Sequence, residues 1–274
     1  MDLGVVIGLV LAVAAILGAN VIDGGSLTAL LNPAAALLVV GGTLGATAIS
    51  NRFTDMLAVP RLVLATVRPP QIDLSATVER LVALALKARR GGLLSLEEDL
   101  ADIADPFLAR GLQMVVDGAD GNAVRDVLRT EMTLRERAAS RHASLFESAG
   151  GFAPTMGIMG TVLGLIHVLA NLANAAQLGP SIATAFLATF YGISTANVFW
   201  LPMAQKMRQN ARTMSVQAEL TLEGVLSIQA GDNPSAVRDK LMVFLQDAGD
   251  RRPNGPTTVP ADSEPKAPTG NRVA

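Results

Sequence analysis

Four long apolar runs constrain the fold of this chain more than any other feature of the sequence. They cover residues 3–22, 27–50, 149–173 and 181–203, and none contains an aspartate, glutamate, lysine or arginine. A helix needs about 20 apolar residues to cross the hydrocarbon of a bilayer, and a buried helix of a soluble protein rarely has so long a run. Only 17% of the residues are charged, against about 25% in an average soluble domain. The sequence therefore predicts an all-α membrane protein with four transmembrane helices.

The lysines and arginines are distributed unevenly between the segments that join these runs. The loop 51–148 holds 13 of the 22 and the part after residue 203 holds 9, whereas the short links 23–26 and 174–180 hold none. Because basic residues mark the cytoplasmic side of a membrane protein, we expect both termini and the large loop in the cytoplasm.

Five parts follow from this topology. They are a first transmembrane hairpin (1–50), a cytoplasmic helical loop (51–148), a second transmembrane hairpin (149–203), further cytoplasmic helices (204–250) and a tail (251–274). The tail is rich in proline, threonine and charge and has no apolar period, so we expect it to be disordered.

The polar segments contain several helix-capping signals. Asp73 or Ser75 is expected to start a helix that ends at Gly91-Gly92, and Ser95 and Asp105 are expected to start two short ones. A long helix is expected to run from Asn122 without a break into the third span. The fourth span is expected to continue to about residue 229, and a last helix to run from Pro234 to about residue 249.

Pairs of glycines four residues apart occur in three of the four runs. These pairs, which let membrane helices approach closely, are Gly4 and Gly8, Gly41 and Gly45, and Gly160 and Gly164. Packing within one chain and packing between copies in an oligomer both explain them.

Composition excludes several kinds of functional site. The chain has no cysteine, two histidines and a net charge of −2, so it offers no thiolate or dense imidazole metal site and no basic field for nucleic acid. No intramembrane catalytic pair or phosphate-binding loop is present. We therefore expect no enzyme activity, no cofactor and no metal site.

The spans contain no carboxylate, although carriers of protons or cations nearly always use one inside the membrane. If the chain moves ions, a partner must supply this carboxylate. The spans do contain Pro154 and Thr161, which share a helix face, and Thr189 and Pro202. A carbonyl freed by proline and a hydroxyl can contribute to a cation path. Alternatively, the threonines bond to their own helix and the prolines only bend it. The role of His167, a proton relay or a neutral side chain near the outer interface, stays open.

A basic cluster with Arg89 and Arg90 stands just before an acidic cluster with Glu97 and Glu98 in the large loop. Each cluster carries the charge that its helix end prefers. The two opposed clusters can also dock a charged partner.

Several of these segments resemble the flagellar stator A subunits, MotA and PomA. Residues 153–165 (APTMGIMGTVLGL) and 188–202 (ATFYGISTANVFWLP) are similar to the last two spans of that family, and residues 32–45 to its second span. The stretch from Arg89 to Glu97 resembles its charged cytoplasmic loop. The resemblance extends over roughly residues 1–250.

The resemblance implies a stator subunit of the bacterial flagellar motor, which turns ion flow into torque for swimming. Five such subunits would surround a dimer of a B-type subunit (MotB or PomB) that supplies the ion-carrying aspartate, and they would push on the rotor protein FliG. The following roles are implied by the same resemblance: Thr161 and Thr189 in the ion pathway, Pro154 and Pro202 in conformational coupling, and Arg89, Arg90, Glu97 and Glu98 in rotor contact.

The transported ion is Na+ or H+, and hydroxyls at both threonine positions favour sodium. An alternative function within the same wider family is that of TolQ or ExbB, which energise outer-membrane processes. Their usual three-span topology lacks the first hairpin found here.

Overall fold

Helices make up the regular structure of residues 2–250, the part that the computed structural model describes, and no β strand occurs in this part. Four helical segments are long and apolar enough to cross a membrane: Leu3–Ile22, Leu27–Ser50, and stretches within Gly121–Ala170 and Leu178–Gln229. The predicted all-α membrane fold is thereby confirmed. The tail 251–274, for which we predicted disorder, lies outside the described residues.

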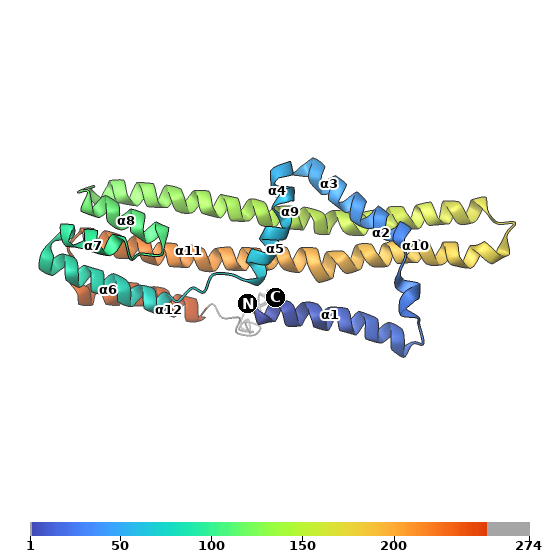
Figure 1. The fold of residues 1–274 in the computed structure, drawn as a ribbon, viewed down its shortest axis with the longest axis horizontal. Helices are drawn as coiled ribbons and strands as arrows, with labels where there is room; N and C mark the ends of the chain where they lie inside the picture. The colour runs from blue at the N-terminus through green and yellow to red at the C-terminus, as the bar shows by residue number, and fades with distance from the viewer. Residues whose placement is uncertain (1, 251–274) are drawn as a thin grey trace, which may run out of the picture.

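Two long antiparallel helical rods form the axis of the molecule (Figure 1). One is the 50-residue helix α9 (Gly121–Ala170). The other consists of α10 (Ala175–Thr195), the π-helical turn η4 (Ala196–Trp200) and α11 (Leu201–Gln229). The expected continuation of the third and fourth spans beyond the membrane is therefore present. Asp120, rather than Asn122, caps α9, since its carboxylate accepts from the Asn122 and Ala123 amides.

The first hairpin lies beside the rods and consists of α1 (Leu3–Ile22) and an interrupted second span (Figure 1). That span comprises η1 (Leu27–Leu30), α2 (Pro33–Ala36), the π-helical turn η2 (Leu37–Gly41) and α3 (Gly42–Ser50). Asn32 is extended and its side chain caps α2 by accepting from Ala35 N at 3.0 Å. Proline at the first position of α2 has no amide to continue a helix backwards, so the uniform apolar run contains a break.

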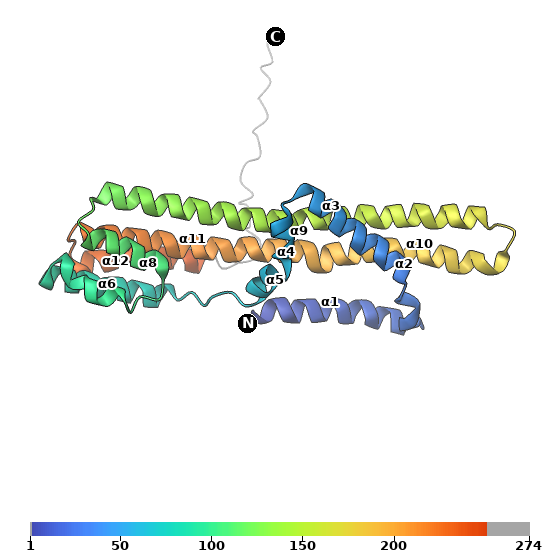
Figure 2. The same cartoon turned by 45° about the horizontal axis from the view of Figure 1, so that its top comes forward.

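Two short helices that the sequence analysis did not identify follow the second span. They are α4 (Phe53–Leu57) and α5 (Val59–Val67), which run across the rods from the end of α3 to the start of α1 (Figures 1 and 2). The inner side chains of α5, among them Leu62 and Val63, pack against Phe146 and Met203 of the rods.

The remaining helices gather around one end of the rods and form what we call the base. It comprises α6 (Leu74–Gly91), η3 (Leu93–Leu96), α7 (Glu97–Leu100), α8 (Pro106–Val116) and α12 (Pro234–Asp250), with the adjoining ends of α9 and α11. Asp73 and Asp105 cap α6 and α8 as expected. Ser95 does not start α7: it lies inside the 3-10 turn η3, where its hydroxyl donates to Gly92 O at 2.7 Å. The tight turn after Gly92, which has φ 80, forces this 3-10 geometry before α7 can begin.

Candidate functional site

Two threonine hydroxyls meet between α9 and α10, where the third and fourth spans cross. Thr161 Oγ1 lies 3.2 Å from Gly157 O of its own helix and 3.3 Å from Ala185 O of the other, and it bonds to Thr189 Oγ1. Thr189 Oγ1 lies 3.3 Å from the same Gly157 O. Each hydroxyl has one proton to donate, so these contacts are alternatives. The result is a part-buried cluster of four oxygens with more than one possible arrangement of hydrogen bonds.

Glycines permit the close approach of α9 and α10 that brings the threonines together. A Cβ on Gly157 would lie 2.9 Å from Ala188 O, and one on Gly192 would lie 2.5 Å from Ala153 O. Both obstacles are backbone atoms, so no side-chain rotation could relieve them. The predicted pair Gly160 and Gly164 also faces α10, through Ala188 and Ala185, whereas a Cβ on Gly8 or Gly45 would meet nothing in this chain.

A hydrogen-bonded clasp that the sequence analysis missed fastens the second span to α10. Tyr191 OH donates to Leu30 O and accepts from Asn32 N at 2.9 Å. The Asn32 side chain donates to Thr184 Oγ1 at 2.8 Å. The two Tyr191 bonds occupy backbone groups that the break in the second span leaves free. Tyr191 lies two residues after Thr189 on α10. The sequence signal for this feature was Asn-Pro within an apolar run. It predicts a break in the helix but not that Tyr191 binds there.

The two prolines lie on either side of one contact between the rods. Pro154 is inside α9, so the carbonyl of Gly150 has no helical donor. Gly150 is buried against Leu201 and Trp200 at the start of α11. Pro202 follows directly, where the π-helical turn η4 continues into α11, and it has no amide to donate to the preceding turn. The structure therefore brings the two proline-bearing turns together, while Pro202 itself is exposed.

Ion pairs join the helices just beyond these prolines, at the ends of the spans. Arg208 of α11 forms a bidentate pair with Glu147 of α9, both distances being 2.7 Å, and the hydrogen bond from Arg208 holds the pKa of Glu147 below its ordinary value. Lys206 pairs with Asp2, the cap of α1. Its hydrogen bond likewise lowers the pKa of Asp2. These pairs fix the lateral positions of α1, α9 and α11 at the level where the spans end.

The predicted rotor-contacting charges lie on the outside of the base. Arg89 and Arg90 are exposed in the last turn of α6, and Glu97 and Glu98 are exposed at the start of α7. None of the ion pairs described in residues 2–250 joins these arginines to these glutamates.

Lys87 instead neutralises part of the acidic cluster. It lies 2.7 Å from Asp99 and 3.7 Å from Glu98, and the hydrogen bond to Asp99 raises the pKa of Lys87. Arg89, Arg90 and Glu97 remain available to a partner.

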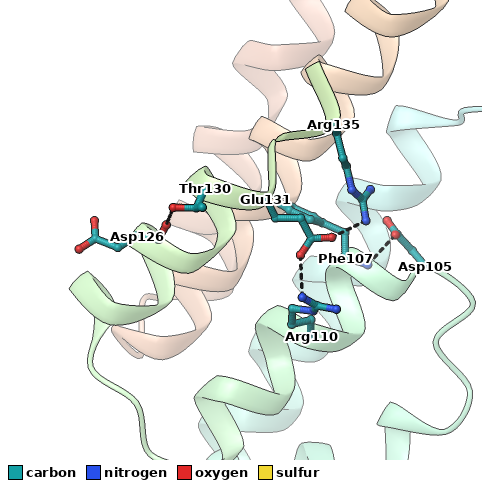
Figure 3. A network of polar contacts seen from close by, with 7 residues as sticks. All are labelled: Asp105, Phe107, Arg110, Asp126, Thr130, Glu131 and Arg135. Carbon is teal, nitrogen blue, oxygen red and sulfur yellow. Dashed lines mark hydrogen bonds and ion pairs between the residues drawn. The ribbon is translucent and has the colours of Figure 1, made fainter. Parts of the chain in front are cut away.

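A second charged network in the base ties α8 to α9 (Figure 3). Glu131 of α9 lies 2.6 Å from Arg135 on the same helix and 3.4 Å from Arg110 of α8. The Arg135 guanidinium also lies over the Phe107 ring, 5.2 Å from its centroid. Only 18% of the Glu131 side chain is exposed, so this network is structural support for the charged outer surface.

His167 lies in the last turn of α9 and is exposed, with its carbonyl accepting from Asn171 Nδ2 at 2.9 Å. It belongs to no cluster with Thr161 and Thr189. Among the described residues, no group of three histidine, aspartate or glutamate side chains could hold a metal ion.

The geometry defines a multi-pass helical membrane protein whose hydroxyl-bearing hairpin continues as unbroken rods into a charged base. Two family models match the chain: the MotA/TolQ/ExbB proton channel family over residues 99–220 and the Motility protein A N-terminal model over residues 6–92. The chain belongs to the MotA/TolQ/ExbB proton channel family. This is a family of ion channels, and the chain is not an enzyme, as its sequence predicts.

Relatives and solved structures match most of the chain. Motility protein A of Bacillus subtilis (strain 168) is 36% identical over 249 residues, which are 89% of this chain and 91% of the relative. That of Treponema pallidum (strain Nichols) is 37% identical over 245 residues, 89% and 94% of the two chains. The flagellar MotAB stator complex from Bacillus subtilis superposes with a TM-score of 0.83 at 35% identity, covering 89% of this chain and 97% of that one. The structure of C. jejuni MotAB gives a TM-score of 0.85 at 27% identity, covering 89% and 96%.

Proposed function

We propose that this chain is the A-type subunit of a flagellar stator, which with a B-type subunit conducts ions and turns their flow into torque. One observation carries the proposal: the helices that hold Thr161 and Thr189 in the membrane are the same rods that support the base. A rearrangement at the threonines therefore has a rigid route to Arg89, Arg90 and Glu97, the charges proposed to push on the rotor protein FliG.

A B-type subunit, MotB or PomB, supplies the ion-binding aspartate in this proposal. The four spans contain no carboxylate of their own, and the two solved structures compared above are MotAB complexes. Binding an ion at the partner's aspartate changes the charge that the threonine oxygens face. We propose that a homopentamer of this chain around a B dimer steps in response, in the bacterial inner membrane with both termini in the cytoplasm.

Each step is expected to be small. One charge that crosses 100 mV releases about 2.3 kcal/mol, which suits a ring of repeated small movements. The proline-bearing turns around Gly150 and Leu201 supply the flexible contact, because a helix lacking a backbone bond bends at low cost. Pro154 and Pro202 thus couple ion passage to movement of the base.

Sodium is the proposed ion. Two hydroxyl and two carbonyl oxygens gather at Thr161 and Thr189, and hard cations prefer oxygen ligands, whereas a proton needs only the carboxylate. Thr161→Val is expected to abolish sodium-dependent swimming while assembly remains intact. Swimming that persists unchanged at very low sodium but stops with an uncoupler would overturn the sodium proposal and leave a proton-driven stator.

The alternative function is that of an outer-membrane energiser of the TolQ or ExbB type. The match of residues 6–92 to the Motility protein A N-terminal model favours a stator. Deleting the gene distinguishes the two: normal filaments on cells that cannot swim support the stator proposal. Cells that swim but have a defective envelope or impaired iron uptake support the alternative.

A further inference from the structure

We infer that the outer face of α4 and α5 is a binding site for anionic phospholipids. This face combines three exposed arginines with three exposed apolar side chains, and we call it the arginine stripe. Its members are Arg52, Phe53, Leu57, Arg61, Leu64 and Arg68. The exposed fractions of Phe53, Leu57 and Leu64 are 70%, 70% and 55%.

The spacing places these side chains along one surface. Phe53 and Leu57 are four residues apart on α4, and Leu64 lies three residues after Arg61 on α5, with Arg68 at the C-cap where that helix ends. Residues three or four apart lie on the same face of a helix. Phe53 and Leu57 therefore share one face of α4, and Arg61 and Leu64 share one face of α5. Arg52 and Arg68 stand at the two ends of the segment.

The opposite face of α5 is anchored, which fixes the stripe outward. Leu62, Val63 and Val67 pack against the cluster of Leu145, Phe146, Met203 and Ala204 on the rods. Thr66 is buried, and its carbonyl accepts from Asn210 Nδ2 at 3.4 Å. The segment cannot turn its exposed apolar side chains inward without losing these contacts.

Both ends of the segment are held at the level where spans end. α4 begins three residues after Ser50, the last residue of the second span. At the other end, Asp2 N, which precedes the first span, donates to Val67 O at 2.8 Å. α4 and α5 also run across the rods (Figures 1 and 2). With the rods crossing the membrane, we expect the segment to lie along the membrane surface.

The charge of the stripe is uncompensated within the part of the chain that the structure describes. None of the ion pairs there involves Arg52, Arg61 or Arg68, and the one acid of the segment, Asp55, points to Arg141 at 3.7 Å. At a membrane surface, a guanidinium reaches headgroup phosphates while apolar side chains enter the acyl region. A lipid with a net negative headgroup satisfies both halves of the stripe, whereas a soluble anion leaves the apolar half in water.

Lipid selectivity in a reconstituted complex tests the inference. The full-length chain with its B-type subunit is placed in phosphatidylcholine bilayers, and spin-labelled phosphatidylglycerol and phosphatidylcholine are compared for the fraction immobilised at the protein. We expect phosphatidylglycerol to associate more strongly at low salt, by about fivefold per arginine at the stripe, diluted by the other lipid positions around the spans. The preference should weaken in high salt, because exposed charges are screened.

Arginine variants test whether the stripe is the source of the preference for phosphatidylglycerol. Arg52→Gln, Arg61→Gln and Arg68→Gln together should bring the association ratio toward one, and the three corresponding lysine replacements should retain most of it. The matched control removes the same charge from the base with Arg89→Gln, Arg90→Gln and Arg129→Gln and should leave the ratio unchanged. If the triple glutamine variant does not assemble, the three single variants are measured instead. Each should lose part of the preference for phosphatidylglycerol. Equal association of the two lipids with the unaltered complex, as when a neighbouring copy covers the face, overturns the inference, and so does an equal loss in the control.

Discussion

The base and the membrane half of this molecule are packed in different ways. The base has a continuous core of large aliphatic and aromatic side chains, among them Leu81, Phe107, Leu112 and Leu128, all at most 1% exposed. In the membrane half the buried residues are mainly small, as at Ala35, Ala188 and the glycines between α9 and α10, and α1 has no buried residue. Water drives the first kind of packing, whereas lipid does not, so close approach and hydrogen bonds hold the second.

This difference indicates where partner chains and lipids must contribute. The base closes its core within one chain, so its exposed charges are free for function. The membrane half leaves large apolar side chains exposed on α1 and on α9, including Leu3, Ile7, Ile158 and Ile166. Gly8 of α1 and Gly45 of α3 are exposed as well, and a Cβ on either would meet nothing in this chain.

The largest expected effect is a loss of stability in the base from Leu112→Ala. Leu112 is 0% exposed, and removing such a side chain leaves a cavity that costs about 2–5 kcal/mol. Hydrogen exchange of the purified protein should rise in α8 and α11 and stay unchanged between α9 and α10. Leu94→Ala, at a site 70% exposed, is the control and should change little. Equal loosening of the membrane half would show that the two regions do not fold independently.

A smaller but more local effect is expected from Gly192→Leu in the membrane half. The new Cβ would collide with Ala153 O, and overpacking of this kind costs about 1–3 kcal/mol. The helices should separate and the Thr161–Thr189 bond should break, so cells should stop swimming although the protein remains in the membrane. Gly45→Leu is the control. A Cβ at Gly45 would meet nothing in this chain, so this variant should leave the melting midpoint of the protein unchanged. Normal swimming with Gly192→Leu would contradict the need for close approach.

Tyr191→Phe should loosen only the clasp on the second span. It removes the acceptor of Asn32 N and the donor to Leu30 O, at a cost of about 1 kcal/mol for a hydrogen bond in this setting. Exchange of the Asn32 amide should accelerate. Thr184→Val removes the bond from the Asn32 side chain and the bond from Thr184 to Pro180 O of its own helix. It leaves both Tyr191 bonds in place and should have a smaller effect on the Asn32 amide. If both variants exchange like the unaltered protein, another contact holds the break in place.

Local signals in the sequence predicted the base better than the membrane half. Asp73, Asp105 and Gly92 act on backbone groups a few residues away, so their capping roles follow from spacing alone. The clasp between Tyr191 and Asn32 joins residues 159 apart, and no local pattern specifies such a pair. Likewise, α4 and α5 are too short for a clear helical period, and the rods they pack against come later in the chain. The meeting of Thr161 with Thr189 was implied by family resemblance, not by spacing.

The smallest expected effect is at the boundary between the two regions, in the pair of Glu147 and Arg208. Both side chains are about 40% exposed, so solvent screens the pair and Arg208→Gln should lower the melting midpoint only slightly. Because the pKa of Glu147 is below its ordinary 4.5 in the folded protein, the pair stabilises the fold above that value. The stabilisation is lost as the pH falls through the lowered pKa.

The difference between the variant and the unaltered protein should therefore vanish in acid and shrink in high salt. Arg212→Gln removes the same charge one turn further along α11 and should show no such pH dependence. A difference that persists unchanged below the folded pKa would mean that Arg208 holds the rods together by packing rather than by charge. The boundary would then be held by packing, as the base is.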